Sequence, residues 1–161
     1  MKKLSTYLFL LLFSFQASSW ADDISDFEIE GMSIGDSLLD YFSKKEIKDN
    51  TNTDYYTNNK YTSVEFFGLP AFKIYDAVQL NYKTDDKKYI IDAIGGTLFC
   101  EKNIEKCNKK QKEIDLELSN VFKNAKRVDD KGKHGADKSG KSTLIHINFW
   151  LISGDVATIE L

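Results

Sequence analysis

The chain has 161 residues, of which 42% are hydrophobic, and its formal net charge at pH 7 is −3. This length predicts a single domain that can bury a core without the help of a metal ion. The acidic balance argues against nucleic acid as a partner, because phosphate binding requires a basic surface.

The first 21 residues have the features of a secretory signal peptide. Two lysines precede an apolar run over residues 7–15, and Ser19 and Ala21 place small residues three and one positions before a cut. The run is much shorter than the roughly 20 residues of a membrane-spanning helix, and no cysteine near the cut could carry a lipid. Cleavage after Ala21 removes two lysines and no acidic residue, so residues 22–161 form one predicted domain with a net charge of about −5. We expect a periplasmic or secreted protein that keeps no stable membrane span.

Two short helices are predicted near the start of the mature chain. Ser33 can cap a helix, with Asp36 three residues later, and apolar residues then recur at helical spacing. A second cap, Ser43 with Glu46, predicts a break and another short helix. Residues 49–60 are polar and rich in Asn and Thr, which predicts a surface loop.

Three strands are predicted after this loop. Residues 61–67 are mostly β-branched or aromatic, and residues 74–82 place apolar side chains on one face. Residues 90–100 form the returning strand of a hairpin, in which Gly95 and Gly96 indicate a bulge or a close backbone approach.

One long helix and a last hairpin complete the chain. Asn103 can cap a helix whose apolar face also holds Gln111, while the other face is almost entirely Lys and Glu. Residues 129–142 contain no large apolar side chain and are predicted to be a mobile loop. Residues 143–151 alternate between apolar and polar side chains and residues 156–161 return, which predicts a hairpin.

This order of elements predicts an α+β fold. Adjacent hairpins favour an antiparallel sheet, here of about five strands. The two short N-terminal helices and the one long helix are expected to pack on one face of that sheet.

The two cysteines of the chain are expected to pair. Cys100 closes an apolar strand and Cys107 falls in the first turn of the following helix, and export places both in an oxidising compartment. Such a short loop suggests a disulfide worth roughly 2–3 kcal/mol. A free redox pair or two metal ligands are the alternatives, but the C-x6-C spacing matches neither the C-x-x-C motif nor common zinc sites.

Three motifs could carry chemistry, and each has a simpler interpretation. Residues 135–142, GADKSGKS, match the G-x-x-x-x-G-K-S phosphate loop, but charged residues precede them and strand-like residues follow, which predicts a flexible hairpin loop. His134 and His146 are interpreted as exposed polar residues. Asp76 and Asp92 could meet across a hairpin as a carboxylate pair able to perform acid–base chemistry. We favour outward orientation or pairing with lysines, which avoids a buried unpaired charge.

Aromatic side chains are the most suggestive remaining feature. Exposed Tyr and Trp often mark a contact with a protein or ligand, although small cores also use them to fill space. The candidate binding residues are Tyr55, Tyr56, Tyr61, Tyr75 and Trp150.

One segment resembles known envelope proteins. Residues 31–39, GMSIGDSLL, are similar to the helix-opening G-M-[ST] segment of the SmpA/OmlA outer-membrane lipoproteins and the β-lactamase-inhibitor-protein-like domains. The resemblance covers fewer than twenty residues and implies short helices on an antiparallel sheet and a role in binding other proteins. The chain departs from these families by lacking a lipidation cysteine and by inserting its long helix between strands. The whole sequence looks more like a family of small exported bacterial proteins, and neither resemblance transfers a functional residue.

The function that we expect from these features is binding without catalysis. The partner would be another envelope protein or a small ligand, contacted through the sheet and its aromatic residues, with no cofactor, metal or nucleic acid. Two alternatives stay open: a small hydrolase-type enzyme that uses Asp76 and Asp92, and a structural envelope protein without a ligand.

Overall fold

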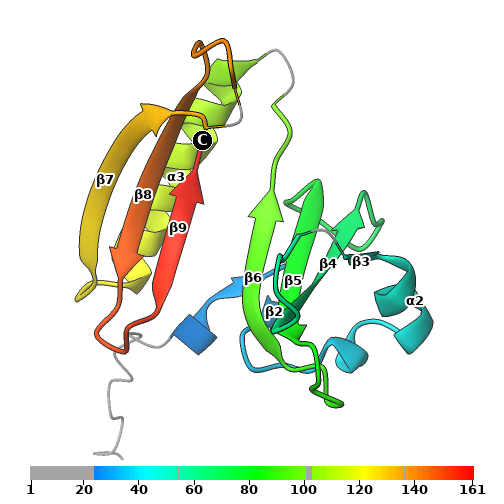
Figure 1. Ribbon diagram of the computed structural model, residues 1–161. Coiled ribbons are helices and arrows are strands. Elements are labelled where there is room, and N and C mark those ends of the chain that lie inside the picture. Colours follow the sequence, from blue (N-terminus) through cyan, green and yellow to red (C-terminus); the bar gives the residue numbers. More distant parts are fainter. Residues whose placement is uncertain (1–23, 54, 101–102, 136) are drawn as a thin grey trace, which may run out of the picture.

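The structure is a computed structural model that describes residues 24–53, 55–100, 103–135 and 137–161. The predicted signal peptide, residues 1–21, lies outside the described residues. The described residues form nine strands in three antiparallel sheets, together with one long helix and a few short helical segments (Figure 1). The fold is therefore mostly β.

The N-terminal part consists of five short elements. In chain order these are η1 (Ile24–Asp26), β1 (Glu28–Ile29), β2 (Met32–Ser33), η2 (Leu38–Asp40) and α2 (Lys44–Asp49).

The predicted helix that begins at Ser33 is wrong. Glu30 and Gly31 both have positive φ, 53° and 79°, and turn the chain so that Ser33 lies in a β-hairpin. The Ser33 N–H donates to the Asp36 carboxylate at 2.9 Å, so Asp36 stabilises the turn that follows the hairpin instead of a first helical turn. The second predicted helix is confirmed as α2, where Ser43 and Glu46 form a complete capping box.

A four-stranded sheet follows, in the order β3-β4-β5-β6. Its strands are β3 (Thr51–Asn52), β4 (Tyr61–Phe67), β5 (Ala77–Lys83) and β6 (Ile91–Thr97). The three long strands match the prediction. The bulge lies between Asn81 and Tyr82, whereas Gly96 marks the predicted close approach, made by the ring of Tyr75.

The C-terminal part is a three-stranded sheet with α3 (Ile104–Val121) packed on it. Its strands are β7 (Lys126–Lys133), β8 (Thr143–Trp150) and β9 (Val156–Glu160). The long helix and the last hairpin are confirmed, with Asn103 as the N-cap.

The mobile loop predicted over residues 129–142 is wrong in its first part, which belongs to β7. Every residue of β7 is exposed, so no apolar alternation signals this strand. The strand forms because its backbone pairs along its whole length with β8, whose inner side chains are apolar. Arg127 also binds Asp115 of α3, with Nε and Oδ1 2.8 Å apart.

The predicted α+β fold, with one antiparallel sheet of about five strands and three helices on one face, is wrong. The expectation that strands adjacent in sequence pair as hairpins is correct on each side of α3, but α3 separates β6 from β7 in the chain. Among the described residues the long strands therefore form two sheets, and no ladder joins β6 to β9.

Two hydrophobic clusters stabilise the two sheets. The first lies between the four-stranded sheet and the N-terminal elements, and the second lies between α3 and the three-stranded sheet. Phe27 and Ile34 pack against both clusters, so the N-terminal segment connects them. The largest fully buried side chains are Phe122, Phe149, Leu38, Ile47, Leu80, Ile91, Val64 and Val78.

Candidate functional site

A groove with a volume of about 810 Å³ separates the two sheets. Its walls are β6 and β9, the edge strands that face each other with α3 behind them (Figure 1). We call it the inter-sheet groove. Its size falls within the range of about 300–1,000 Å³ that is typical of ligand sites.

The floor of the inter-sheet groove is apolar. Ile114 and Leu118 contribute to it from α3, and Phe27 and Ile34 contribute from the N-terminal segment. One polar group lies among them: Gln111 of α3 lines the groove, and its Nε2 is buried without a hydrogen-bond partner in the described residues. A ligand that offers an oxygen here would satisfy this amide.

A carboxylate from the N-terminal hairpin fixes one wall. Glu30 accepts hydrogen bonds from the backbone N–H groups of Lys73, Ile74 and Tyr75 at 2.7–2.8 Å. Burial raises the pKa of Glu30, but these three bonds outweigh it and hold the pKa below its ordinary value. The segment they hold carries Tyr75, whose ring lies so close to Gly96 that a Cβ there would meet Tyr75 Cδ1 at 2.5 Å. Burial in turn raises the pKa of Tyr75.

The mouth of the inter-sheet groove is more polar than its floor. Gln79 and Gly95 are opposite each other in the β5–β6 ladder, on the sheet face away from the buried Val78 and Leu80. Both line the groove, together with Tyr55, whose side chain is 50% exposed. The groove thus offers a polar and aromatic entrance above an apolar floor.

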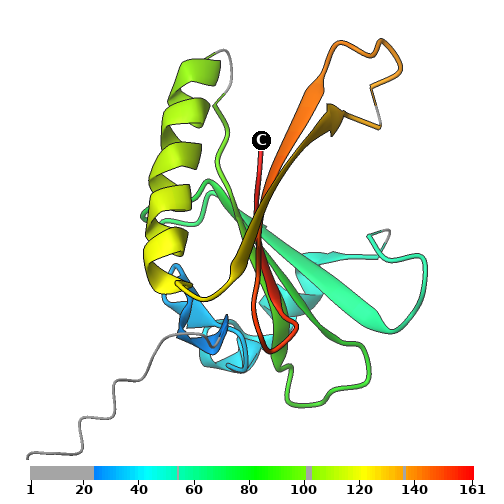
Figure 2. The same ribbon diagram turned by 90° about the vertical axis from the view of Figure 1, so that its left-hand side faces the viewer.

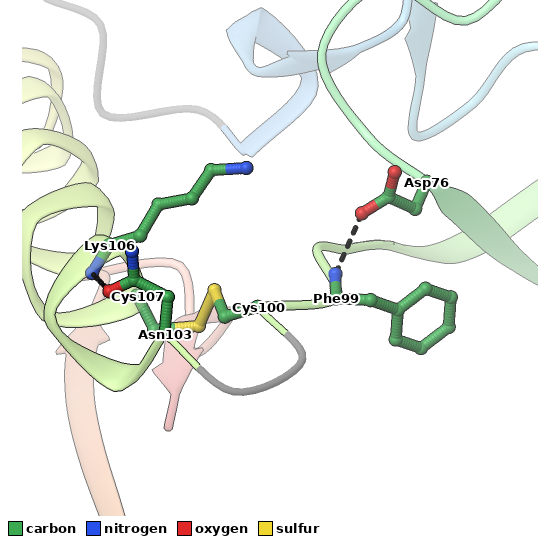
Figure 3. The surroundings of a disulfide bond; sticks show 6 residues. All are labelled: Asp76, Phe99, Cys100, Asn103, Lys106 and Cys107. Carbon is green, nitrogen blue, oxygen red and sulfur yellow. Dashed lines mark hydrogen bonds between the residues drawn. A yellow bond between two sulfur atoms is a disulfide. The ribbon is translucent and has the colours of Figure 1, made fainter.

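A disulfide closes one end of the inter-sheet groove. Cys100 and Cys107 are bonded, which confirms the predicted pair (Figure 3). Both residues line the groove. Asp76 accepts a hydrogen bond from the Phe99 N–H at 2.7 Å, and Asn103 caps α3 by accepting from Lys106 N–H. The segment that follows β6 is therefore attached both to the four-stranded sheet and to α3.

Among the described residues, three of the four charged side chains that line the groove form ion pairs, and the fourth, Asp155, accepts a hydrogen bond from the Ser153 hydroxyl at 2.7 Å. Asp92 lies 3.7 Å from Lys83, and Glu160 lies 3.0 Å from His146 Nε2. Lys110 lies 3.4 Å from Glu113 within α3. No group of three or more His, Cys, Asp or Glu side chains in the described ranges is placed to hold a metal ion. The groove is suited to binding apolar and polar groups, and the one His–carboxylate pair at its edge, within the part of the chain that the structure describes, is that of His146 with Glu160.

The two candidate carboxylates do not meet. The Asp76 N–H donates to the carbonyl of Thr97 at one end of β6, whereas Asp92 lies at the other end, beside the bulge. Thr97 and Asp92 are five residue steps apart, which corresponds to roughly 16 Å along a strand. The alternative of lysine pairing describes Asp92, through Lys83.

The five candidate aromatic residues fall into separate groups. Tyr55, Tyr56 and Tyr61 form a cluster, with ring centroids 4.9 Å and 5.9 Å apart in turn. Tyr55 and Tyr75 both line the inter-sheet groove. Trp150 ends β8 with half of its surface exposed and is not part of the groove lining.

The phosphate-loop match lies in the turn between β7 and β8. Its backbone N–H groups at Ser139, Lys141 and Ser142 donate to the carboxylate of Asp137 at 2.7–3.1 Å. The position that a phosphate would occupy is therefore filled by a side chain of the loop itself, and a strand follows in place of a helix. His134 begins this turn, where its N–H donates to the Ser142 carbonyl.

Sequence reasoning missed the groove and most of its lining. The available signals were the candidate residues Tyr55 and Tyr75, which line the groove, and Gln111, a polar residue on the apolar face of the long helix. No sequence feature indicated that β6 and β9 face each other, because these strands are far apart in the chain and do not pair.

Among the described residues, no helix combines the length and the apolar character that crossing a membrane requires. No protein-family model, curated protein sequence or solved structure matches the chain.

Proposed function

We propose that this protein is a non-enzymatic binding module of the periplasm or of the secreted fraction, and that the inter-sheet groove is its binding site. The observation that carries the proposal is the groove itself: an apolar floor, a polar mouth and a buried unpaired amide between two edge strands. The charged side chains Asp92 and Lys110 that line the groove are held in ion pairs, which favours binding over catalysis.

The disulfide supports the location. A bond between Cys100 and Cys107 forms and persists in an oxidising compartment, which is where a signal peptide ending at Ala21 would deliver the chain. Ligands of the groove would then be envelope proteins or small molecules of the same compartment. The two candidate carboxylates give the hydrolase alternative no geometric support, because they lie at opposite ends of β6.

The test is affinity capture from an envelope extract with variants that fill or spare the groove. Gly95 lines the mouth, and a Cβ there meets no heavy atom within 4 Å, so Gly95→Trp introduces a ring at the groove with no clash at its Cβ. Lys131→Trp places the same ring on the exposed β7 strand and serves as the matched control.

We expect wild type and Lys131→Trp to retain the same ligand and Gly95→Trp to lose it, as measured by mass spectrometry of the eluted proteins and small molecules. Equal recovery by all three proteins, or no specific ligand with any of them, would contradict the proposal.

A further inference from the structure

Resting on the proposed function of the inter-sheet groove, we infer that its ligand is an extended polypeptide strand, supplied by a partner protein, that inserts between β6 and β9 and runs antiparallel to both. The inference starts from the backbone of the two walls, because a strand is recognised through main-chain hydrogen bonds.

The unpaired backbone groups of β6 follow from the ladder geometry. The bonds from Gly68 N–H to Asp76 and from Thr84 N–H to Lys60 show that the even-numbered residues of β5 bond to β4. The odd-numbered residues of β5 therefore bond to the odd-numbered residues of β6. The N–H and C=O groups of Ile94 and Gly96 consequently point into the inter-sheet groove, and no backbone partner for them is found in the described ranges.

The same argument applies to β9. Ile145 and Leu161 exchange both backbone hydrogen bonds, at 2.7 Å and 2.9 Å, so the odd-numbered residues of β9 bond to β8. Val156, Thr158 and Glu160 thus direct their N–H and C=O groups into the inter-sheet groove from the opposite wall. Two rows of alternating donors and acceptors face the same space.

The direction of the walls selects an antiparallel strand. β6 and β9 both run toward the end of the molecule where the C-terminus lies (Figures 1 and 2). One strand of opposite direction can therefore form antiparallel ladders with both walls at once. The five residues of β9 span roughly 17 Å, which fits an occupant of about five to seven residues.

The outer edges of the four-stranded and three-stranded sheets are protected against such pairing, whereas the parts of β6 and β9 that border the groove are not. The outer edge of one sheet is β3, only two residues long, and the outer edge of the other is β7, with the basic sequence KRVDDKGK. Short strands and lysines are the usual protection of exposed edges. β6 (IDAIGGT) and β9 (VATIE) contain no Lys, Arg or Pro. The backbone of Ile91, at the start of β6, is paired with Gly35 and Asp36, so the part of β6 that is open to the groove begins after Ile91.

The lining also specifies the side chains of the occupant. Alternate residues of a strand point to opposite faces, so one set would meet Ile114 and Leu118 and the other would face Tyr55 and Gln79. The inner set is therefore apolar, with one hydroxyl or amide oxygen placed to accept from Gln111 Nε2. The outer set is polar or aromatic.

The probe is a synthetic peptide that alternates valine with threonine over about seven residues and carries a lysine at each end for solubility. It is added to the exported, oxidised protein, and amide hydrogen exchange is followed by NMR. We expect exchange at Ile94, Gly96, Thr158 and Glu160 to slow by about tenfold or more. Exchange at Lys131, whose N–H points outward from the far edge of β7, should not change.

Two blocked forms sharpen the test. Thr158→Pro removes one N–H that points into the groove and leaves the β8 ladder intact, and proline is tolerated at such edge positions. Thr158→Val is its matched control, because both variants lose the hydrogen bond to Asn148. A peptide N-methylated at alternate residues removes donors without any change to the protein. We expect both blocked forms to bind about tenfold more weakly or worse than their controls.

Three results would overturn the inference. One is unchanged exchange at the edge amides on peptide addition, and another is equal binding by the N-methylated peptide. The third is protection that appears without peptide and grows with protein concentration, which would identify a second copy of the chain as the occupant. If Gly95→Trp loses its envelope ligand while the peptide protects nothing, the proposed function stands and the strand inference fails.

Discussion

The contact between Gly96 and Tyr75 gives the sharpest test of how the groove wall is built. Gly96→Ala places a Cβ 2.5 Å from Tyr75 Cδ1, closer than real Cβ contacts occur. The Tyr75 ring cannot move away easily, because the Tyr75 backbone is held by Glu30. Overpacking of this kind costs about 1–3 kcal/mol of unfolding free energy.

Gly95→Ala is the matched control for this substitution. Its Cβ meets nothing within 4 Å, so the reduced entropy of the unfolded chain should leave it neutral or more stable by about 0.4–1 kcal/mol. The same entropic gain applies at Gly96, so the difference between the two variants isolates the clash. We expect Gly96→Ala to be less stable than Gly95→Ala by roughly 2 kcal/mol.

The assay is urea denaturation of the oxidised proteins, followed by circular dichroism. Adding Tyr75→Ala to both variants removes the ring, and in that background Gly96→Ala and Gly95→Ala should be equally stable within about 0.5 kcal/mol. Equal stability in the wild-type background would refute the contact, and a difference that survives Tyr75→Ala would place its cause elsewhere.

Three further predictions concern the stability of the whole chain. Replacing Cys100 and Cys107 together by serine should lower the unfolding free energy by roughly 2–3 kcal/mol in urea denaturation, and no change would contradict the disulfide's role. Leu118→Ala, at a side chain that is 3% exposed, should cost about 2–5 kcal/mol, whereas Leu116→Ala, at one that is 65% exposed, should cost under about 0.5 kcal/mol in the same assay. Because the pKa of Glu30 is lowered in the folded state, its contribution is complete above the unfolded value near 4.5 and is lost as the pH falls through the folded value. Thermal denaturation should therefore show that wild type loses more stability than Glu30→Gln between pH 7 and about pH 3, and parallel losses would refute the assignment.

Elements with a local sequence signal were predicted well. Asn103 and the capping box of Ser43 and Glu46 identify the starts of α3 and α2, because a helix start is determined by side chains within a few residues. The alternation of β4, β5 and β8 identifies strands that bury one face. The cysteine pair follows from its position between a strand and a helix start.

Elements that depend on distant partners were not predictable. β7 has no buried side chain and exists only as the pairing partner of β8. Ser33 reads as a helix cap locally, but the positive φ values of Glu30 and Gly31 and the Glu30 contacts to residues 73–75 impose a hairpin. The groove depends on where α3 places β9 relative to β6, and that information is spread over both hydrophobic clusters.

The separation of the two sheets is itself a consequence of strand direction and of the N-terminal segment. Since β6 and β9 run the same way, direct pairing would give a parallel ladder, which is slightly less stable per residue than an antiparallel one. Phe27 and Ile34, which line the groove, also pack on both clusters and so connect the two sheets through the N-terminal segment. The antiparallel strand that we propose would satisfy both edges, and it would join the four-stranded and three-stranded sheets into one continuous sheet over α3.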